Sequence, residues 1–133
     1  MSRTVVLDAS ALMAYFEKST GAPKVAELIR QARNNRVRIL MSSVNWGEVY
    51  YSTLKEGGRQ EAESIKGIVA SLPLGVVDAD ARQAELAGDI KVAYGVPYAD
   101  CFAAALARSE GASLMTMDRD FKSLEDQIKI IWV

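Results

Sequence analysis

The 133-residue sequence contains no histidine and only one cysteine, Cys101. The lack of histidine excludes nucleophilic sites that pair serine or cysteine with histidine, and it excludes RNA cleavage by two histidines. Tetrahedral zinc is nearly excluded too, because such sites need several nitrogen or sulfur ligands. Any catalytic metal must therefore be held by oxygen, which favours a hard cation such as Mg²⁺ or Mn²⁺.

The sequence also has almost no net charge and too few cysteines for an internal disulfide. With 16 basic and 17 acidic residues the formal net charge is −1, so a broadly basic nucleic-acid-binding surface is not expected, although local patches are not excluded. One cysteine allows no internal disulfide, and Asp8 and Glu17 interrupt the first segment before it could form a signal peptide or a membrane span. We expect a single domain over residues 1–133, located in the cytoplasm and not associated with a membrane.

Short apolar runs alternate with longer segments of helical period, which is typical of an α/β domain built on a parallel sheet. The apolar runs predict strands over residues 4–7, 37–41, 74–77, 113–117 and 128–133. The intervening segments predict helices over residues 10–16, 24–32, 45–55, 62–72, 81–94 and 97–108. The third of these should end at Gly57 and Gly58, and the last, which is apolar nearly all round, should lie in the interior.

Four acidic residues occupy positions where ordinary surface charge is not expected. Asp8 follows the first predicted strand and Asp118 follows the fourth, and ligands of open parallel sheets bind beyond the carboxyl ends of the strands. If the strand order is 3-2-1-4-5, both carboxylates face one crevice. Asp100 lies in the predicted interior helix, where a lone carboxylate needs a cation or several hydrogen-bond donors. Glu48 follows the second strand and could reach the same sheet edge.

Each of these acids also has a purely structural interpretation. Asp8 could cap the following helix, Asp118 could form an Asx turn, and Glu48 could close a capping box with Asn45. Asp100 would suit the positive end of a helix dipole. Convergence of all four on one sheet edge is better explained by a metal site, because clustered carboxylates repel one another until a divalent cation neutralises them. Such oxygen-only sites recur in phosphodiester hydrolysis.

The sequence resembles the PIN domain, and most closely the small single-domain ribonuclease toxins of the VapC type. The resemblance covers essentially the whole chain and rests on four blocks: VVLDASAL at 5–12, the helix holding Glu48, YADCFAAALA at 98–107 and TMDRDF at 116–121. It implies a three-layer α/β/α fold around a five-stranded parallel sheet of order 3-2-1-4-5. The acidic positions match the family pattern, whereas Cys101 stands where a small apolar residue is usual.

The resemblance further implies a catalytic, metal-binding set of four carboxylates, namely Asp8, Glu48, Asp100 and Asp118. Asp120 would be an additional or water-mediated metal ligand, and Ser10 and Thr116 match hydroxyl positions that orient the carboxylates. The implied activity is Mg²⁺- or Mn²⁺-dependent endoribonuclease cleavage that leaves 5′-phosphate and 3′-hydroxyl ends. The implied partners are an RNA substrate, a cognate antitoxin that holds the enzyme inactive, and a second copy in a homodimer.

Three alternative functions fit the sequence less well. A phosphoacceptor receiver domain also carries acids at strand ends, and Asp78 ends the third predicted strand, but Asp8 has no acidic neighbour to complete a Mg²⁺ pair. A catalytically silent PIN scaffold that only binds RNA or a partner is opposed by the intact acidic positions. A D-x-D phosphatase is excluded because Ser10 stands where the second aspartate is required.

Basic residues give a weaker indication of substrate binding. They comprise a group between the second predicted helix and strand and a pair beside the proposed metal ligands: Arg30, Arg33, Arg36, Arg38, Arg119 and Lys122. Exposed arginines more often form a solvated surface than contact phosphates, so none is assigned to substrate from the sequence.

Overall fold

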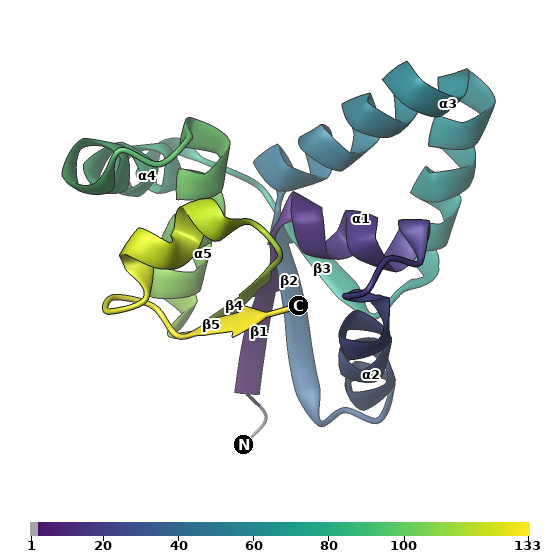
Figure 1. The fold of residues 1–133 in the computed structure, drawn as a ribbon, viewed down its shortest axis with the longest axis horizontal. Helices are drawn as coiled ribbons and strands as arrows, with labels where there is room; N and C mark the ends of the chain where they lie inside the picture. Colours follow the sequence, from purple (N-terminus) through teal and green to yellow (C-terminus); the bar gives the residue numbers. More distant parts are fainter. Residues whose placement is uncertain (1–2) are drawn as a thin grey trace.

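The structure, a computed structural model, describes residues 3–133 and contains a central sheet of five strands. The strands are β1 (Arg3–Leu7), β2 (Val37–Ser42), β3 (Leu74–Val77), β4 (Ser113–Thr116) and β5 (Ile130–Trp132). All neighbouring strands pair in parallel, in the order β3-β2-β1-β4-β5 (Figure 1). The predicted five-stranded parallel sheet of order 3-2-1-4-5 is confirmed. The strand order reverses at β1, which places β1 and β4 side by side.

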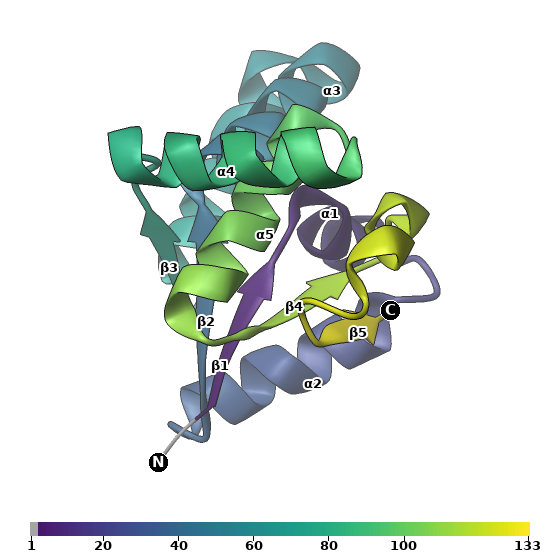
Figure 2. The ribbon, with the colours of Figure 1, turned by 90° about the vertical axis from the view of Figure 1, so that its left-hand side faces the viewer.

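Helices cover both faces of this sheet. They are α1 (Ala9–Glu17), α2 (Ala22–Arg33), α3 (Ser43–Ser71), α4 (Ala81–Tyr94) and α5 (Tyr98–Glu110), with a 3₁₀ helix, η1 (Arg119–Leu124). Figure 2 shows α4 and α5 in front of the sheet, with α1, α2 and α3 behind it. The expected three-layer α/β/α arrangement is therefore present. In residues 3–133, none of the helices has both the length and the hydrophobicity that a membrane span requires.

Alternate side chains of the strands supply two separate cores. Val6, Leu40 and Leu114 pack toward α4 and α5, and the intervening strand residues pack toward α1, α2 and α3. Burial on both faces explains why the strands read as nearly continuous apolar runs. Every residue of α5 from Asp100 to Ala107 is buried, so the prediction of an interior helix is confirmed.

The carboxyl ends of the strands lead directly into helices at one edge of the sheet. Asp8 caps α1 immediately after β1, and Asp118 caps η1 shortly after β4. The helix η1 was not predicted from the sequence, because its six residues have only two buried side chains, Phe121 and Leu124, and carry too little apolar pattern to reveal a 3₁₀ helix. The edge that bears these acids lies between the first half of α3 and the side of the molecule formed by α5 and η1 (Figure 1).

α3 changes direction at Gly58, as the predicted helix end there indicated. Gly58 has φ 84° and ψ 179°, whereas the residues on either side continue the helix. Figure 1 shows the resulting bend between an inner arm beside α1 and an outer arm that returns toward β3. This backbone conformation is essentially restricted to glycine. The bend therefore depends on residue type at one position.

We predict that Gly58→Ala lowers the free energy of unfolding by about 1–3 kcal/mol, because alanine is strained at this φ and ψ. Gly67→Ala is the matched control, since Gly67 lies in regular helix and a Cβ there would meet nothing within 4 Å. It should stabilise the protein by about 0.5–1 kcal/mol. Urea denaturation of both variants checks the sign, and equal effects would contradict a glycine-dependent bend.

Candidate active site

Asp8 is buried at the end of β1 with three hydrogen-bond donors around its carboxylate. Its Oδ1 accepts from the Ala11 amide at 3.0 Å and from Ser10 Oγ at 2.8 Å, and its Oδ2 accepts from Thr116 Oγ1 at 2.6 Å. The residue is only 2% exposed. Since a carboxylate has about four lone-pair positions, one remains free. Asp8 thus caps α1 and keeps acceptor capacity at the sheet edge.

Ser10 and Thr116, the hydroxyls expected to orient carboxylates, link the ends of β1 and β4. Thr116 Oγ1 donates to Asp8 and accepts from the Asp118 amide at 2.9 Å, while Ser10 Oγ accepts from the Met117 amide at 2.9 Å. The two hydroxyl oxygens are 3.2 Å apart. These bonds hold Asp8 and the backbone of Asp118 in a fixed relation.

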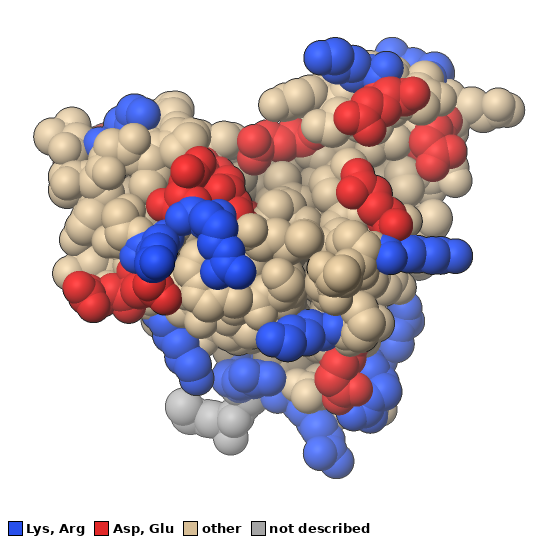
Figure 3. All heavy atoms as spheres, viewed as in Figure 1, with Lys and Arg blue, Asp and Glu red and all other residues tan. Residues whose placement is uncertain are grey.

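Three carboxylates from two elements form a compact cluster. Oxygen atoms of Asp100, Asp118 and Asp120 all lie within 4.8 Å of one another. Asp118 Oδ1 accepts from the Asp120 amide at 2.9 Å, which makes the turn that places both acids on the same side. Asp100 reaches them from the first turn of α5. Figure 3 shows acidic side chains on both sides of the notch between the inner arm of α3 and the side of the molecule formed by α5 and η1.

Asp100 is the member of the cluster most in need of a cation. It is 8% exposed, and its buried Oδ2 has no hydrogen-bond partner among residues 3–133. Leaving a buried acceptor unpaired costs about 1–3 kcal/mol, and more for a charged group. Burial, followed by the neighbouring Asp118, raises the Asp100 pKa to about 8, with smaller contributions from Asp8 and Glu48.

The pKa of the Asp8 carboxyl is also raised, but by less than that of Asp100. Burial raises its pKa to about 6, although the hydrogen bonds from Thr116, Ala11 and Ser10 act in the opposite direction. The charge of Asp118 adds to the increase. Both buried aspartates therefore hold their protons to a higher pH than a free aspartate does, as expected for crowded carboxylates.

Glu48 lies beside this cluster, and its carboxylate is held by a neighbour on α3. Glu48 Oε1 accepts from Asn45 Nδ2 at 2.9 Å. The interpretation of these two residues as a capping box was wrong, because α3 begins two residues earlier and Ser42 Oγ accepts from the Val44 amide as the cap. Two consecutive serines before Asn45 obscured the true start of the helix. Asn45 therefore does not cap α3.

The donor set suits a hard divalent cation. The cluster offers only carboxylate oxygens, one of them buried without a partner, and Mg²⁺ and Mn²⁺ prefer oxygen ligands. Asp100, Asp118 and Asp120 could contact one ion directly. Asp8 and Glu48 lie outside that compact set but close enough to affect the Asp100 pKa.

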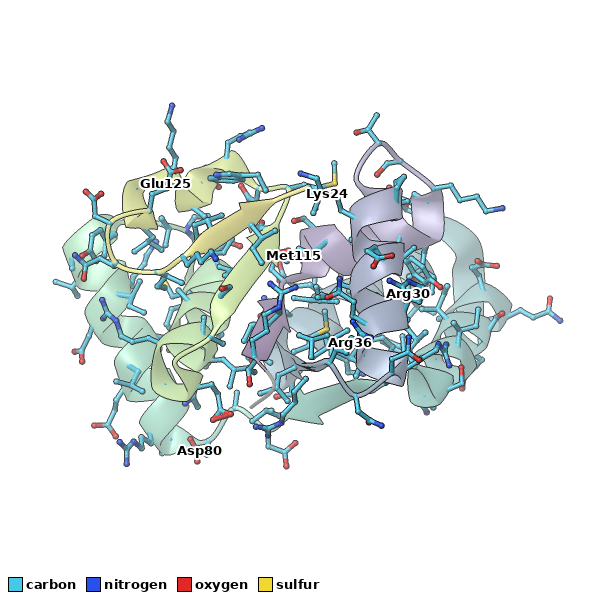
Figure 4. The ribbon with its side chains drawn as sticks, turned by 90° about the horizontal axis from the view of Figure 1, so that it is seen from below. Lys24, Arg30, Arg36, Asp80, Met115 and Glu125 are labelled. Carbon is cyan, nitrogen blue, oxygen red and sulfur yellow. The ribbon has the colours of Figure 1, made fainter. Side chains whose placement is uncertain are left out.

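Apart from Arg119 and Lys122, which neighbour the acids in the sequence, the other candidate residues lie away from the cluster. Arg30 pairs with Glu27 and Arg38 with Glu110, and both arginines belong to the opposite, amino edge of the sheet. Figure 4 shows Arg30 and Arg36 on this underside. Asp78 is exposed beside the edge strand β3, and receiver-type doubly wound sheets have the order 2-1-3-4-5. The observed order therefore opposes the receiver interpretation.

Comparisons with known proteins agree with this fold. The PIN domain family model matches residues 5–127. The VapBC2 complex of Rickettsia felis bound to a promoter DNA fragment is similar, with a TM-score of 0.74, 22% identity, and coverage of 96% of this chain and 97% of that chain. VapC20 of Mycobacterium tuberculosis, a toxin that cleaves the sarcin-ricin loop, has a TM-score of 0.73 and 16% identity over 97% of this chain and 99% of its own.

VapBC-1 of nontypeable Haemophilus influenzae has a TM-score of 0.76 and 16% identity, with 97% of each chain covered. At these identities the likeness concerns the fold. No curated protein matches the sequence.

We predict that metal-free protein loses stability between pH 6 and pH 8, and that Asp100→Asn removes this loss. The folded state keeps the Asp100 proton up to a pKa of about 8, whereas the unfolded chain releases it near the ordinary aspartate pKa of 3.8. The unfolded state therefore binds fewer protons in this range, and the free energy of unfolding falls as pH rises. The sequence has no histidine, which would ordinarily titrate here.

Urea denaturation in EDTA at pH 6, 7 and 8 measures the effect. Asp80→Ala is the contrasting variant: it removes the cap of α4, whose exposed carboxylate accepts from the Gln83 amide, so it should cost about 0.5–2 kcal/mol at every pH. An Asp100→Asn variant that is less stable than wild type at pH 8 would contradict the repulsion described above.

Proposed function

The chain belongs to the PIN domain family, and from that premise we propose that it is a Mg²⁺- or Mn²⁺-dependent endoribonuclease that acts in the cytoplasm as the toxin of a type II toxin–antitoxin pair. The observation that carries the proposal is the cluster of Asp100, Asp118 and Asp120, whose carboxylates each have an oxygen within 4.8 Å of the others, together with the buried Asp100 Oδ2, which has no hydrogen-bond partner in residues 3–133. Without a counter-ion such a group is electrostatically unfavourable.

The carboxylates divide the proposed work between them. Asp100, Asp118 and Asp120 hold the cation, and Asp8 and Glu48 complete the negative environment that favours a doubly charged ion. Ser10 and Thr116 keep Asp8 in place through their hydrogen bonds. Because these groups are already fixed by hydrogen bonds and packing, little reorganisation is needed when the substrate binds.

A bound Mg²⁺ or Mn²⁺ supplies the chemistry that the absent histidines cannot, namely stabilisation of charge on the scissile phosphate and activation of water. The carboxylates alone would repel RNA phosphates, so both binding and cleavage should depend on the cation. Attack of water on phosphorus would leave the 5′-phosphate and 3′-hydroxyl ends expected of the family.

The structural relatives support the proposed role as a toxin. The Rickettsia felis and Haemophilus influenzae structures are VapBC complexes, and the Mycobacterium tuberculosis protein is an RNA-cleaving toxin. By analogy this chain would be inhibited by a cognate antitoxin and would form a homodimer. The negative charge of Asp118 and Asp120 would favour an antitoxin segment with a basic side chain at the site.

We predict that purified protein cleaves 5′-labelled single-stranded or hairpin RNA in the presence of Mg²⁺ or Mn²⁺ and that EDTA stops cleavage. Asp100→Asn and Asp118→Asn should each reduce the rate by about 100-fold or more, because each removes a carboxylate that would hold the cation, and the cation would stabilise the developing charge. Gel electrophoresis of the labelled fragments, with end-group analysis, measures both rate and product chemistry.

Asp80→Asn is the matched control, since Asp80 is an exposed aspartate that caps α4 and lies away from the cluster. It should change the rate less than twofold. Cleavage that persists in EDTA would overturn metal dependence, and RNA binding without cleavage under all metal conditions would indicate a silent scaffold instead.

A further inference from the structure

Asn45 has a buried amide that neither caps a helix nor belongs to the acidic set. Its side chain is 0% exposed, between the inner arm of α3 and the start of α5. One Nδ2 group donates to Glu48 Oε1 at 2.9 Å and to the carbonyl oxygen of Ala99 at 3.1 Å. Ala99 immediately precedes Asp100. A single amide therefore connects the Glu48 carboxylate to the turn that carries Asp100.

The other atom of this amide indicates what the residue provides. Asn45 Oδ1 is buried without a hydrogen-bond partner among the described residues. An apolar side chain of similar size would avoid that unpaired oxygen, so the Oδ1 atom gives no reason for an amide at this position. What an apolar residue would lose is the donor shared by Glu48 and Ala99.

A neutral donor suits this position better than a charged one. Glu48 is repelled by Asp100, and without a partner its flexible side chain could turn toward solvent. Lysine or arginine would also hold the carboxylate but would place a positive charge beside a cation site. The amide restrains Glu48 and leaves its charge unneutralised.

We infer that Asn45 is a positioning residue: it holds Glu48 and the first turn of α5 at the separation required for binding of a divalent cation. The inference rests on the proposed function, since it concerns the same site. It adds a role for a residue that contacts neither the cation nor RNA.

Isothermal titration of the full-length protein with Mn²⁺ tests this inference. Asn45→Leu should weaken Mn²⁺ binding about 10-fold or more, as found when groups that orient metal ligands are removed, without lowering the melting temperature of the metal-free protein. Asn45→Ser, which is too short to reach both partners, should weaken binding similarly and serves if the leucine variant does not fold. Thr53→Val removes a buried hydroxyl bonded to Val49 on the same helix and should leave binding unchanged.

A double-mutant cycle with Glu48→Gln separates positioning from general damage. If Asn45 acts through Glu48, the asparagine substitutions should change Mn²⁺ affinity much less in the Glu48→Gln background than in the wild type. Equal loss in both backgrounds, or normal affinity of the single variants, would overturn the inference alone. Failure of the wild-type protein to bind Mn²⁺ would overturn it together with the proposed function.

A different contact points to a position for the substrate. Arg119 lies between Asp118 and Asp120 in the sequence, and its guanidinium carbon is 4.6 Å from the centre of the Trp132 ring. Trp132 Nε1 donates to Glu125 Oε2 at 3.2 Å, which fixes the ring, and Trp132 is paired in register with Thr116. The stacked pair therefore lies at the same sheet edge as the acids.

Stacking keeps this arginine available for an anion. Arg119 is exposed and, within residues 3–133, forms no ion pair with the acids beside it. A guanidinium held over an aromatic ring still presents its N–H groups to a phosphate, and little side-chain entropy is then lost on binding. RNA entering an acidic site needs such a contact outside the metal position.

We further propose that Arg119, supported by Trp132, binds an RNA phosphate next to the one that is cleaved, again on the premise of ribonuclease activity. Fluorescence anisotropy with labelled single-stranded RNA tests this, in an Asp100→Asn background with Mg²⁺ to prevent cleavage. Arg119→Gln should weaken binding about 3- to 10-fold at 0.1 M salt and reduce the salt dependence by about one phosphate contact. Arg33→Gln, an exposed arginine at the opposite sheet edge, should change binding less than twofold.

Tryptophan fluorescence provides a second readout. The chain has two tryptophans, so Trp46→Phe leaves Trp132 as the sole indole, and its emission should change on RNA binding. Unchanged emission at saturating RNA, or equal effects of the two arginine substitutions, would overturn this proposal only. Absence of RNA binding by the protein with Arg119 intact would overturn it together with the ribonuclease proposal.

Discussion

The hydrogen bond from Thr116 Oγ1 to Asp8 Oδ2 joins two residues that are 108 positions apart, and the candidate site depends on it. It secures the end of β1 against the end of β4, where the strand order reverses. The same hydroxyl also positions Asp118, because the Asp118 amide donates to Thr116 Oγ1. Two acids from opposite halves of the chain thus share one small polar network within an otherwise apolar core.

Helix capping and site formation proved to be compatible roles for the same acids. Asp8 caps α1 and Asp118 caps η1, yet both carboxylates face the region where Asp100 lies. From the sequence, helix capping and metal binding are alternative explanations of each acid, because the pattern of one turn does not show which other residues lie near it. A carboxylate has more acceptor positions than a cap requires, and the remaining capacity can serve a cation.

Much of the fold could be predicted because its signals are local. Apolar runs, Gly58 and the largely apolar α5 each indicate a feature that the structure contains. The presence of Asp8 and Asp118 at one sheet edge was expected from topology, but the closer grouping of Asp118 with Asp100 and Asp120 depends on side-chain packing that no spacing reveals. The role of Asn45 could not be predicted, since its partner Ala99 is 54 residues away.

The bend at Gly58 fixes how the inner arm of α3 is rotated about its own axis. Its outer arm is anchored by Ile65 and Val69 in the core, while its inner arm carries Glu48 toward Asp100. Insertion or deletion of one residue between Glu48 and the bend would rotate the carboxylate by about 100° around the helix axis, away from the other acids. Length variation in this protein should therefore be tolerated in its connecting turns, whereas the inner arm has a fixed residue count.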